Sequence, residues 1–463
     1  MNRRHFLQAA GGLAASRLWA QAKRRPNFIF ILTDDLGWGD LGCYGNRAIK
    51  TPSLDQMARQ GTLFTQFYVN NPVCSPSRTA FMTSHFPAHH RIHGHLAEPE
   101  MNRSRAMPNF LDPNVTTVTR LLQRAGYRTA HFGKWHLGKG DDAPMPSAYG
   151  IDEHKTVNSN ENVFPERDPY FRARSTGMLV DETLRFVKKH RDQPFYVNLW
   201  TLVPHAILNP TEEQMKLYAR LTPGGGIPHK GALQIYYSTV TSLDQEIGRL
   251  LKGLEELGVA DNTLVAFSSD NGPEDIHILN ASHSGVGSPG PFRGRKRSLY
   301  EGGVRVPFIV RWPGRIPAGK VDDKTVVTGV DWLPTVCRLA GVDVPADVKP
   351  QGEDMSGALL GTPRNRTKPI FWEWRFRIMG YHVNRSPILA IREGNWKLLM
   401  NPDRSRVELY DIPNDPMEMT NLAEKQPQVV KNLSDKLLAW HKTLPPGPMD
   451  PGAGSLDYPW PGK

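Results

Sequence analysis

The stretch N-F-I-F-I-L-T-D-D, residues 27–35, decides the fold class of this chain. Its unbroken apolar run is typical of a strand buried on both faces, as in parallel sheets that helices cover on either side. The run ends at two consecutive aspartates, Asp34 and Asp35. Ligands collect beyond the carboxyl ends of the strands in such sheets, so the aspartate pair marks a candidate site.

Three further apolar runs end in polar residues in the same way. Residues 126–132 lead to Lys134 and His136, residues 195–200 lead to His205, and residues 263–269 lead to Asp270 and Asn271. Amphipathic helical patterns lie between them, at 118–124, 178–189 and 233–257. Each polar motif alone could equally consist of ordinary turn residues, because aspartate, asparagine and glycine are common in turns. Four of them at strand ends favour one shared site on an α/β fold with a mostly parallel sheet between helices.

The pattern changes near residue 369. Short β runs at 370–374, 388–392, 396–400 and 407–410 precede a final helical pattern at 428–442. This order predicts a smaller subdomain with an antiparallel sheet and one helix. We therefore divide the chain into a leader (1–22), a catalytic domain (23–365) and a C-terminal subdomain (366–463).

The leader resembles an export signal. Arg3 and Arg4 precede a weakly hydrophobic segment, and A-Q-A at residues 20–22 fits a cleavage site. Paired arginines in this position predict the bacterial twin-arginine export machinery as a partner, and a periplasmic or secreted protein. The alternative is an ordinary terminus without a signal.

Composition excludes several classes of protein. No apolar run reaches the length of about 18 residues that a transmembrane helix requires. The net charge of +11 suits anionic substrates. Nucleic acid is not an expected partner, because no basic run is interleaved with aromatics. The three cysteines, Cys43, Cys74 and Cys337, cannot all pair and do not indicate a disulfide framework.

The strand-end residues suggest a metal and an anion together. Asp34, Asp35, Asp270 and Asn271 are hard oxygen donors, which suit Ca²⁺ or Mg²⁺ better than zinc. A divalent cation would relieve the mutual repulsion of the three carboxylates. Most lysines and arginines are simply solvated, and a lone histidine is usually packed in the core. The positive groups that we nevertheless expect around the metal are Arg78, Lys134, His136, His205 and Lys296.

One further stretch, C-S-P-S-R at residues 74–78, reads as a loop that opens into a helix. Placing Pro76 in the first turn would leave the amides of Ser77, Arg78 and Thr79 free to bind an anion. The same stretch resembles the C-x-P-x-R signature of the type I, formylglycine-dependent sulfatases, of the arylsulfatase and N-acetylgalactosamine-6-sulfatase type. Other landmarks of that family follow in order, including K-R-S-L-Y-E-G-G-V-R-V-P at 296–307. The resemblance covers about residues 26–421 and implies an alkaline-phosphatase-like fold.

The resemblance implies a mechanism for Cys74. A formylglycine-generating maturation enzyme would convert this cysteine to an aldehyde, whose hydrate attacks the sulfur of a sulfate ester. Modified Cys74 would share one Ca²⁺ with the four oxygen donors named above. Arg78 would hold the hydrate, whereas the sulfate oxygens would be held by Lys134 and Lys296.

Two histidines complete the implied mechanism. His205 would protonate the leaving alcohol, and His136 would take the second proton of the hydrate. The sequence departs from the family pattern at Ser84, where glycine is common, and at Arg297, where a small residue is common. The first departure bears on recognition by the maturation enzyme.

Export and basic charge favour sulfated carbohydrates as substrates. We expect sugar contacts in the least family-like segment, at Trp374, Arg375, Arg377 and His382, although tryptophan here also fits a packed aromatic stripe. A phosphate or phosphonate monoester hydrolase of the same superfamily is the alternative enzyme, but it would favour two metals. A catalytically silent glycan-binding relative is the alternative outside enzymes, and it would not require the full set of catalytic residues.

Overall fold

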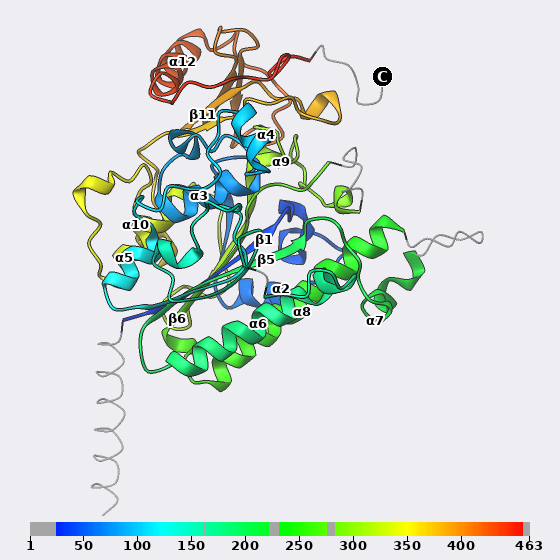
Figure 1. Ribbon diagram of the computed structural model, residues 1–463. Coiled ribbons are helices and arrows are strands. Elements are labelled where there is room, and N and C mark those ends of the chain that lie inside the picture. Colours follow the sequence, from blue (N-terminus) through cyan, green and yellow to red (C-terminus); the bar gives the residue numbers. More distant parts are fainter. Residues whose placement is uncertain (1–24, 162, 222–230, 276–282, 457–463) are drawn as a thin grey trace, which may run out of the picture.

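The computed structural model describes residues 25–161, 163–221, 231–275 and 283–456 (Figure 1). The export signal predicted for residues 1–22 lies outside these ranges. A nine-stranded sheet has the order β4-β3-β5-β1-β6-β7-β2-β8, with β9 also paired to β2. Its strands are β1 (Asn27–Asp34), β2 (Thr62–Tyr68), β3 (Arg128–Lys134), β4 (Glu153–Val157), β5 (Phe195–Pro204), β6 (Thr263–Ser269), β7 (Arg305–Arg311), β8 (Lys320–Asp322) and β9 (Val327–Thr328).

The sheet is mostly parallel, as the sequence predicted. β1 lies at its centre, with Ile29 opposite Val197 of β5 and Val265 of β6 in parallel register. Only β7 among these strands runs the other way, antiparallel to both β6 and β2. The four strands that end in polar motifs, β3, β5, β1 and β6, are therefore adjacent and point in one direction.

Helices cover both faces of the sheet (Figure 1). The side chains of β1 alternate between two cores: Phe28 and Phe30 belong to one, and Ile29 and Ile31 to the other. This alternation explains the unbroken apolar run, since both faces of the strand are buried. The core that contains Ile29 and Ile31 is closed by α2 (Pro52–Arg59), α6 (Phe171–His190) and α8 (Ala232–Glu256). The core that contains Phe28 and Phe30 is closed by α3 (Cys74–Thr83), α5 (Val118–Arg124) and α10 (Trp332–Ala340).

The predicted helices are present with small shifts. α8 matches the predicted helix closely, and the Thr117 hydroxyl caps α5 by accepting from the amide of Arg120 at 3.2 Å. α6 begins at Phe171, seven residues before the predicted start at 178. The shorter α-helices are α4 (Pro99–Ser104), α7 (Glu212–Met215), α9 (Glu301–Val304) and α11 (Ser356–Leu359). Short stretches of 3-10 helix are Trp38–Asp40, Gly42–Tyr44, Pro87–His90, Pro146–Tyr149, Lys216–Leu221, Ala260–Asn262, Ser284–Val286, Gly329–Asp331, Ala346–Val348 and His382–Asn384.

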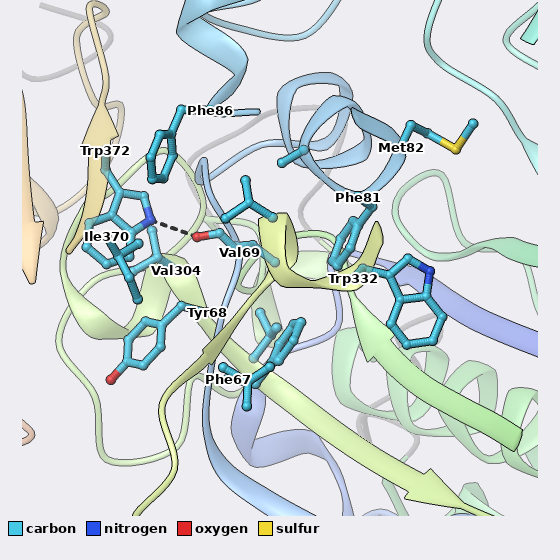
Figure 2. Packing of buried hydrophobic residues seen from close by; sticks show 14 of the residues in the cluster. Phe67, Tyr68, Val69, Phe81, Met82, Phe86, Val304, Trp332, Ile370 and Trp372 are labelled. Atoms are coloured by element: carbon cyan, nitrogen blue, oxygen red, sulfur yellow. Dashed lines mark hydrogen bonds between the residues drawn. The ribbon is translucent and has the colours of Figure 1, made fainter. Parts of the chain in front are cut away.

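A second, antiparallel sheet has the order β10-β11-β12-β13 and carries one helix, again as predicted. Its elements are β10 (Ile370–Glu373), β11 (Leu389–Glu393), β12 (Trp396–Met400), β13 (Glu408–Asp411) and α12 (Pro427–His441). Trp372 of β10 packs against Tyr68 of β2 at 5.9 Å between ring centroids, and its indole N–H donates to the carbonyl of Val69 at 2.7 Å (Figure 2). These contacts join the small sheet to the large one.

Buried charges join the two sheets as well. Lys397 of β12 lies 2.9 Å from a carboxylate oxygen of Glu301 in α9 and 3.0 Å from one of Glu418, and all three side chains are fully buried. We call these three residues the Lys397 cluster. Burial raises the pKa of Glu301, but the charges of Lys397 and Arg305 outweigh it and lower that pKa to about 2. Burial raises the pKa of Glu418 to about 7 despite the opposing charge of Lys397. Among the described residues, no helix is long and apolar enough to cross a membrane.

Candidate active site

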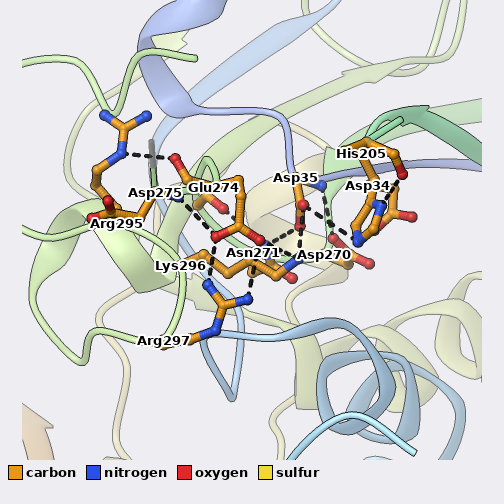
Figure 3. Close-up of polar contacts among 12 residues, drawn as sticks. Asp34, Asp35, His205, Asp270, Asn271, Glu274, Asp275, Arg295, Lys296 and Arg297 are labelled. Carbon is orange, nitrogen blue, oxygen red and sulfur yellow. Dashed lines mark hydrogen bonds and ion pairs between the residues drawn. The ribbon is translucent and has the colours of Figure 1, made fainter. Parts of the chain in front are cut away.

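The four strand-end motifs meet at one edge of the large sheet, as the sequence predicted. Figure 3 shows the motifs that follow β1, β5 and β6. Asp34 is the last residue of β1, and Asp35 follows it with a left-handed φ of 69°. The Asp35 amide donates to Asp270, which follows β6, at 3.2 Å. Lys134, the last residue of β3, donates to Asp34 at 2.7 Å. The parallel register of β1, β3 and β6 thus brings together residues more than 200 positions apart.

The oxygen donors form a buried cluster. The side-chain amide of Asn271 donates to Asp35 Oδ1 at 2.7 Å. Asp34 Oδ1 and Asn271 Oδ1 are buried and accept no hydrogen bond from the described residues. Ligand atoms of Asp34, Cys74 and Asp270 all lie within 4.8 Å of one another, and Asp34, Asp35 and His205 form a second such group. Buried oxygens without donors, close to other carboxylates, are what a hard divalent cation binds, so the donor set fits Ca²⁺ or Mg²⁺.

Three cations pair with the three carboxylates. Arg78 of α3 donates to Asp270 Oδ2 through Nε at 3.0 Å and Nη2 at 2.6 Å. Lys296, in the loop before α9, lies 2.7 Å from Asp35 Oδ2 (Figure 3). The third pair is Lys134 with Asp34, already described. The two predicted sulfate-binding lysines and Arg78, predicted to hold the hydrate, therefore all reach the predicted metal ligands, although Arg78 and Lys296 lie outside the four strands.

The pKa values of the carboxyl groups are pushed apart. Burial raises the pKa of Asp34, but the positive charges of Lys134, His205 and Arg78 outweigh it and hold the pKa well below its usual range. At Asp270, burial and then the charge of Asp34 raise the pKa well above its usual range. Two close carboxylates in a dry site cannot both ionise easily, and a divalent cation removes that conflict.

Cys74 is the first residue of α3, so Pro76 lies in the first turn as predicted, but at its third position. The amide of Ser77 consequently donates to the carbonyl of Val73 at 3.3 Å, so it is not available to an anion. The prediction that Ser77 offers a free amide is wrong, because the helix already includes the residues before Pro76. Cys74 itself is only 3% exposed and faces Asp34 and Asp270.

Ser84 ends α3 in a left-handed conformation, with φ of 61°. Glycine adopts this conformation without steric cost, which explains why a glycine suits the position. Here the serine is held in place, since its hydroxyl donates to the carbonyl of Val330 at 2.5 Å. The departure from the family pattern thus leaves the end of α3 intact.

Both predicted histidines lie at the site. His205 Nε2 is 3.8 Å from Asp35 Oδ2, while His205 Nδ1 lies 2.7 Å from the carbonyl oxygen of Ala206. Burial, followed by the charge of Lys296, lowers the pKa of His205 to about 4. His136 Nε2 lies 3.0 Å from the carbonyl oxygen of Leu96, and burial and Lys134 hold its pKa well below the usual value. Its buried Nδ1 has no hydrogen-bond partner among the described residues.

The structure adds a residue that sequence reasoning missed. Glu274 is buried beside the site, 3.4 Å from Lys296 and paired with Arg297. The charges of Lys296 and Arg297 outweigh its burial and lower its pKa. A signal existed, because Glu274 follows the D-N-G motif by only two residues. Glu274 also neutralises Arg297, the charge that departs from the family pattern.

Two of the four residues that we expected to contact a sugar are buried. Arg375 is buried and lies 2.8 Å from Glu373, and Trp374 is buried against Phe376 at 5.1 Å between ring centroids. These two side chains pack in the subdomain, so the packed-aromatic interpretation is correct for Trp374. Arg377 and His382 are exposed.

Fold and site together place a buried carboxylate cluster, which suits a divalent cation, beside buried cations that suit an anionic ester. Comparison with known proteins assigns the class: residues 26–342 match the sulfatase family, and residues 292–443 match the N-sulphoglucosamine sulphohydrolase C-terminal family. The chain belongs to the sulfatase family and is a sulfuric ester hydrolase.

Relatives agree over most of the chain. N-acetylgalactosamine-6-sulfatase of Canis lupus familiaris is 33% identical over 79% of this chain and 70% of its own length. N-acetylgalactosamine-6-O-sulfatase of Bacteroides thetaiotaomicron is 26% identical over 90% of this chain and 93% of its own length. The solved structure of Ps i-CgsB in complex with k-i-k-neocarrahexaose superposes with a TM-score of 0.76 at 26% identity, and the match covers 91% of this chain and 94% of that one.

Proposed function

We propose that this protein hydrolyses sulfate esters of carbohydrates, using a formylglycine made from Cys74 and one bound Ca²⁺. The observation that carries the proposal is the position of Cys74. Its thiol sulfur lies within 4.8 Å of oxygens of Asp34 and Asp270, and Arg78 pairs with Asp270 at 2.6 Å. A buried structural cysteine has no need of ionised neighbours, whereas a nucleophile precursor beside a metal does.

The described residues fit one divalent cation. Asp34, Asp35, Asp270 and Asn271 would hold it together with the modified side chain of Cys74, because two of their oxygens still lack hydrogen-bond donors. Ca²⁺ bound there would lower the pKa of the hydrated formylglycine, whose hydroxyl oxygen would be the nucleophile. The ion would also screen the negative charge of the sulfate ester.

Lys134 and Lys296 would bind the sulfate oxygens, and Arg78 would hold the hydrated formylglycine. Lys134 and Lys296 are almost fully buried, and Arg78 is completely buried. Fixed charges in a site that excludes water stabilise the negative charge that builds up in the transition state. Metal binding would satisfy the carboxylates that now pair with the two lysines, and would free the ammonium groups to contact sulfate oxygens.

The histidines would move protons. Burial and Lys296 keep His205 neutral at neutral pH in the free protein. A bound anion beside Lys296 opposes that charge, so His205 would gain a proton with the substrate and pass it to the leaving alcohol. His136 would accept a proton at Nδ1, which is buried beside the site and carries no hydrogen bond from the described residues.

Carbohydrate substrates are supported by the relatives. The two curated relatives described above are named for sulfated N-acetylgalactosamine, and Ps i-CgsB was solved with an oligosaccharide. The twin-arginine signal at Arg3 and Arg4 favours export to the periplasm or beyond, where polysaccharide fragments occur. It also predicts that a maturation enzyme acts on Cys74 before export.

Mass spectrometry of the tryptic peptide that contains Cys74 tests the proposal directly. Protein made with a maturation enzyme is expected to have lost the sulfur in favour of an aldehyde oxygen. Cys74→Ala should lower sulfate release from sulfated oligosaccharides by about 10⁴-fold or more, because it removes the covalent nucleophile. An unmodified thiol in active protein, or full activity of Cys74→Ala, would contradict the mechanism. Faster release of phosphate than of sulfate from matched esters would favour the phosphoesterase instead.

A further inference from the structure

One side of the candidate active site is formed by residues 94–96. The carbonyl oxygen of Leu96 lies 3.0 Å from His136 Nε2, and the His95 ring lies 6.5 Å from the His136 ring. Gly94 lies so close to Phe376 that an added Cβ would be 3.0 Å from the phenyl ring. This segment therefore connects the catalytic histidine to an aromatic residue of the C-terminal subdomain.

Arg105 lies over Phe376, the aromatic residue that this segment contacts. It directly follows α4, and its guanidinium carbon is 4.8 Å from the centre of the Phe376 ring. A guanidinium on an aromatic face is favourably placed and held in one orientation. The Phe376 ring is buried and therefore held in place. The guanidinium group of Arg105 thus packs against a fixed surface.

Arg105 differs from the other arginines near the site. Arg78 lies 2.6 Å from Asp270, Arg375 lies 2.8 Å from Glu373, and Arg297 lies 3.1 Å from Glu274. Within the described part of the chain, Arg105 has no carboxylate within ion-pair distance and its guanidinium donates no hydrogen bond. Its side chain is only partly exposed, so this charge is both partly desolvated and unpaired.

Most charged groups between Arg105 and the sulfate-binding position are positive, and Asp450 is the acidic exception. Burial lowers the pKa of Arg105, Asp450 opposes that effect, and the charge of Arg297 adds to it. Burial likewise lowers the pKa of His95 to about 3, and His136, Arg105, Lys296 and Arg297 all add to the effect. Positive groups thus extend from Lys296 at the sulfate-binding position, past His95, to Arg105. Such a field attracts a ligand that carries more than one negative charge.

We propose that Arg105, supported by Phe376, binds a second anionic group of the substrate, a sulfate or a carboxylate at a distance from the ester that is cleaved. This inference rests on the proposed function and narrows the substrate class to polyanionic glycans. The guanidinium group of an arginine can bind either a sulfate or a carboxylate through two parallel N–H donors. The competing explanation is that Arg105 only covers Phe376 with its aliphatic stem, a role that would not depend on the charge of the substrate.

The test compares Arg105→Ala with Arg103→Ala. Arg103 is exposed in the last turn of the same helix, so its replacement removes an equal charge without touching Phe376. Three oligosaccharides share the same cleaved sulfate: one carries no other charge, one carries a second sulfate, and one carries a uronate. We expect Arg105→Ala to lower kcat/KM about tenfold to a hundredfold for a doubly charged substrate, mainly through KM, and to leave the singly charged one unchanged.

Selective loss with one doubly charged substrate identifies its second group, sulfate or carboxylate, as the one that Arg105 binds. Arg105→Lys should restore part of the loss, since it keeps the charge but not the fork. Equal losses on all three substrates, no loss on any, or the same loss with Arg103→Ala would overturn the proposal. Calorimetry of the same oligosaccharides binding to wild type and to Arg105→Ala tests the Arg105 site independently of the proposed sulfatase function. Charge-selective binding without any sulfate release would reject the proposed function and keep the Arg105 site.

Discussion

Two buried charge clusters, the Lys397 cluster and the active-site cluster of Asp34, Asp35, Asp270 and their cations, both pair carboxylates with basic side chains and differ in how completely they are paired. In the Lys397 cluster, Glu301 lies 2.9 Å from Lys397 and 3.2 Å from Arg305, and Glu418 lies 3.0 Å from Lys397. In the active-site cluster, Asp34 Oδ1 has its nearest paired cation at 3.9 Å.

This difference in pairing distinguishes a cluster that stabilises the fold from a cluster that is suited to bind a ligand. A buried carboxylate needs compensation for its lost hydration, and in the Lys397 cluster fixed side chains supply it. At the active site, Asp34 Oδ1 and Asn271 Oδ1 accept no hydrogen bond from the described residues, and the nearest cation paired with Asp34 Oδ1 is 3.9 Å away, whereas the equally buried Glu418 Oε1 lies 3.0 Å from Lys397. Incomplete pairing in a buried cluster indicates that a further charged ligand belongs there.

The largest effect on stability should come from breaking the Lys397 cluster. Lys397→Met leaves Glu301 and Glu418 buried without their shared cation, which should lower the free energy of unfolding by about 3–5 kcal/mol. Thermal unfolding measures the loss as a fall in Tm. The matched control is Lys436→Met, which removes a partly exposed pair with Glu393 and should cost less than about 1 kcal/mol. Equal effects of the two variants would show that the Lys397 cluster does not hold the subdomains together.

A somewhat smaller effect is expected from the metal. Ca²⁺ at about a hundred times its Kd should stabilise the folded protein by about 2.7 kcal/mol, and a chelator should reverse the shift in Tm. Asp270→Asn should weaken the response to Ca²⁺, because it removes one carboxylate ligand. Glu418→Gln should respond to Ca²⁺ like wild type, since its cluster is already paired. A Ca²⁺ response that survives Asp270→Asn unchanged would place the ion elsewhere.

The smallest effect should come from pH at Glu418. Its folded pKa of about 7 is higher than the ordinary value of 4.5, so the folded state binds the proton more tightly. The resulting stabilisation is fully present below about pH 4.5 and is lost as the pH rises through about 7. We expect Glu418→Gln to reduce the fall in Tm between pH 5 and pH 7.5. A fall as steep as that of wild type would assign the pH dependence to other groups.

The sequence was sufficient for the framework and for the residues that the sheet positions. Asp34, Lys134, His205 and Asp270 could be predicted to meet because each follows a run with strand character, and parallel strands share one carboxyl edge. The reversed direction of β7 was not predictable in this way, because residues 305–311 have the same apolar pattern in either direction. Arg78 and Lys296, which no strand end positions, were expected near the metal only as basic residues, and the family resemblance gave each its role.

Side chains whose partners lie far away in the chain were harder to predict. Arg375 looked like a sugar contact, but its carboxylate partner Glu373 also lies near His93, some 280 residues away in the chain. The role of Arg105 depends equally on Phe376, which belongs to the other subdomain. Neither spacing nor composition carries information about such pairs. The Ser77 amide was misassigned for a more local reason, since helix starts are uncertain by one or two residues without a capping side chain.

The burial of α3 sets an order of events in the making of this protein. All ten residues of α3 are buried, and Cys74 at its start is only 3% exposed. A second protein that must grip the segment around Cys74 as an extended strand or loop cannot reach it once the helix has docked. Any enzyme that converts Cys74 must therefore act on the nascent or unfolded chain, in competition with folding. Slow folding would then favour a high yield of matured protein, and a mutation that accelerates docking of α3 would lower that yield while leaving the folded structure unchanged.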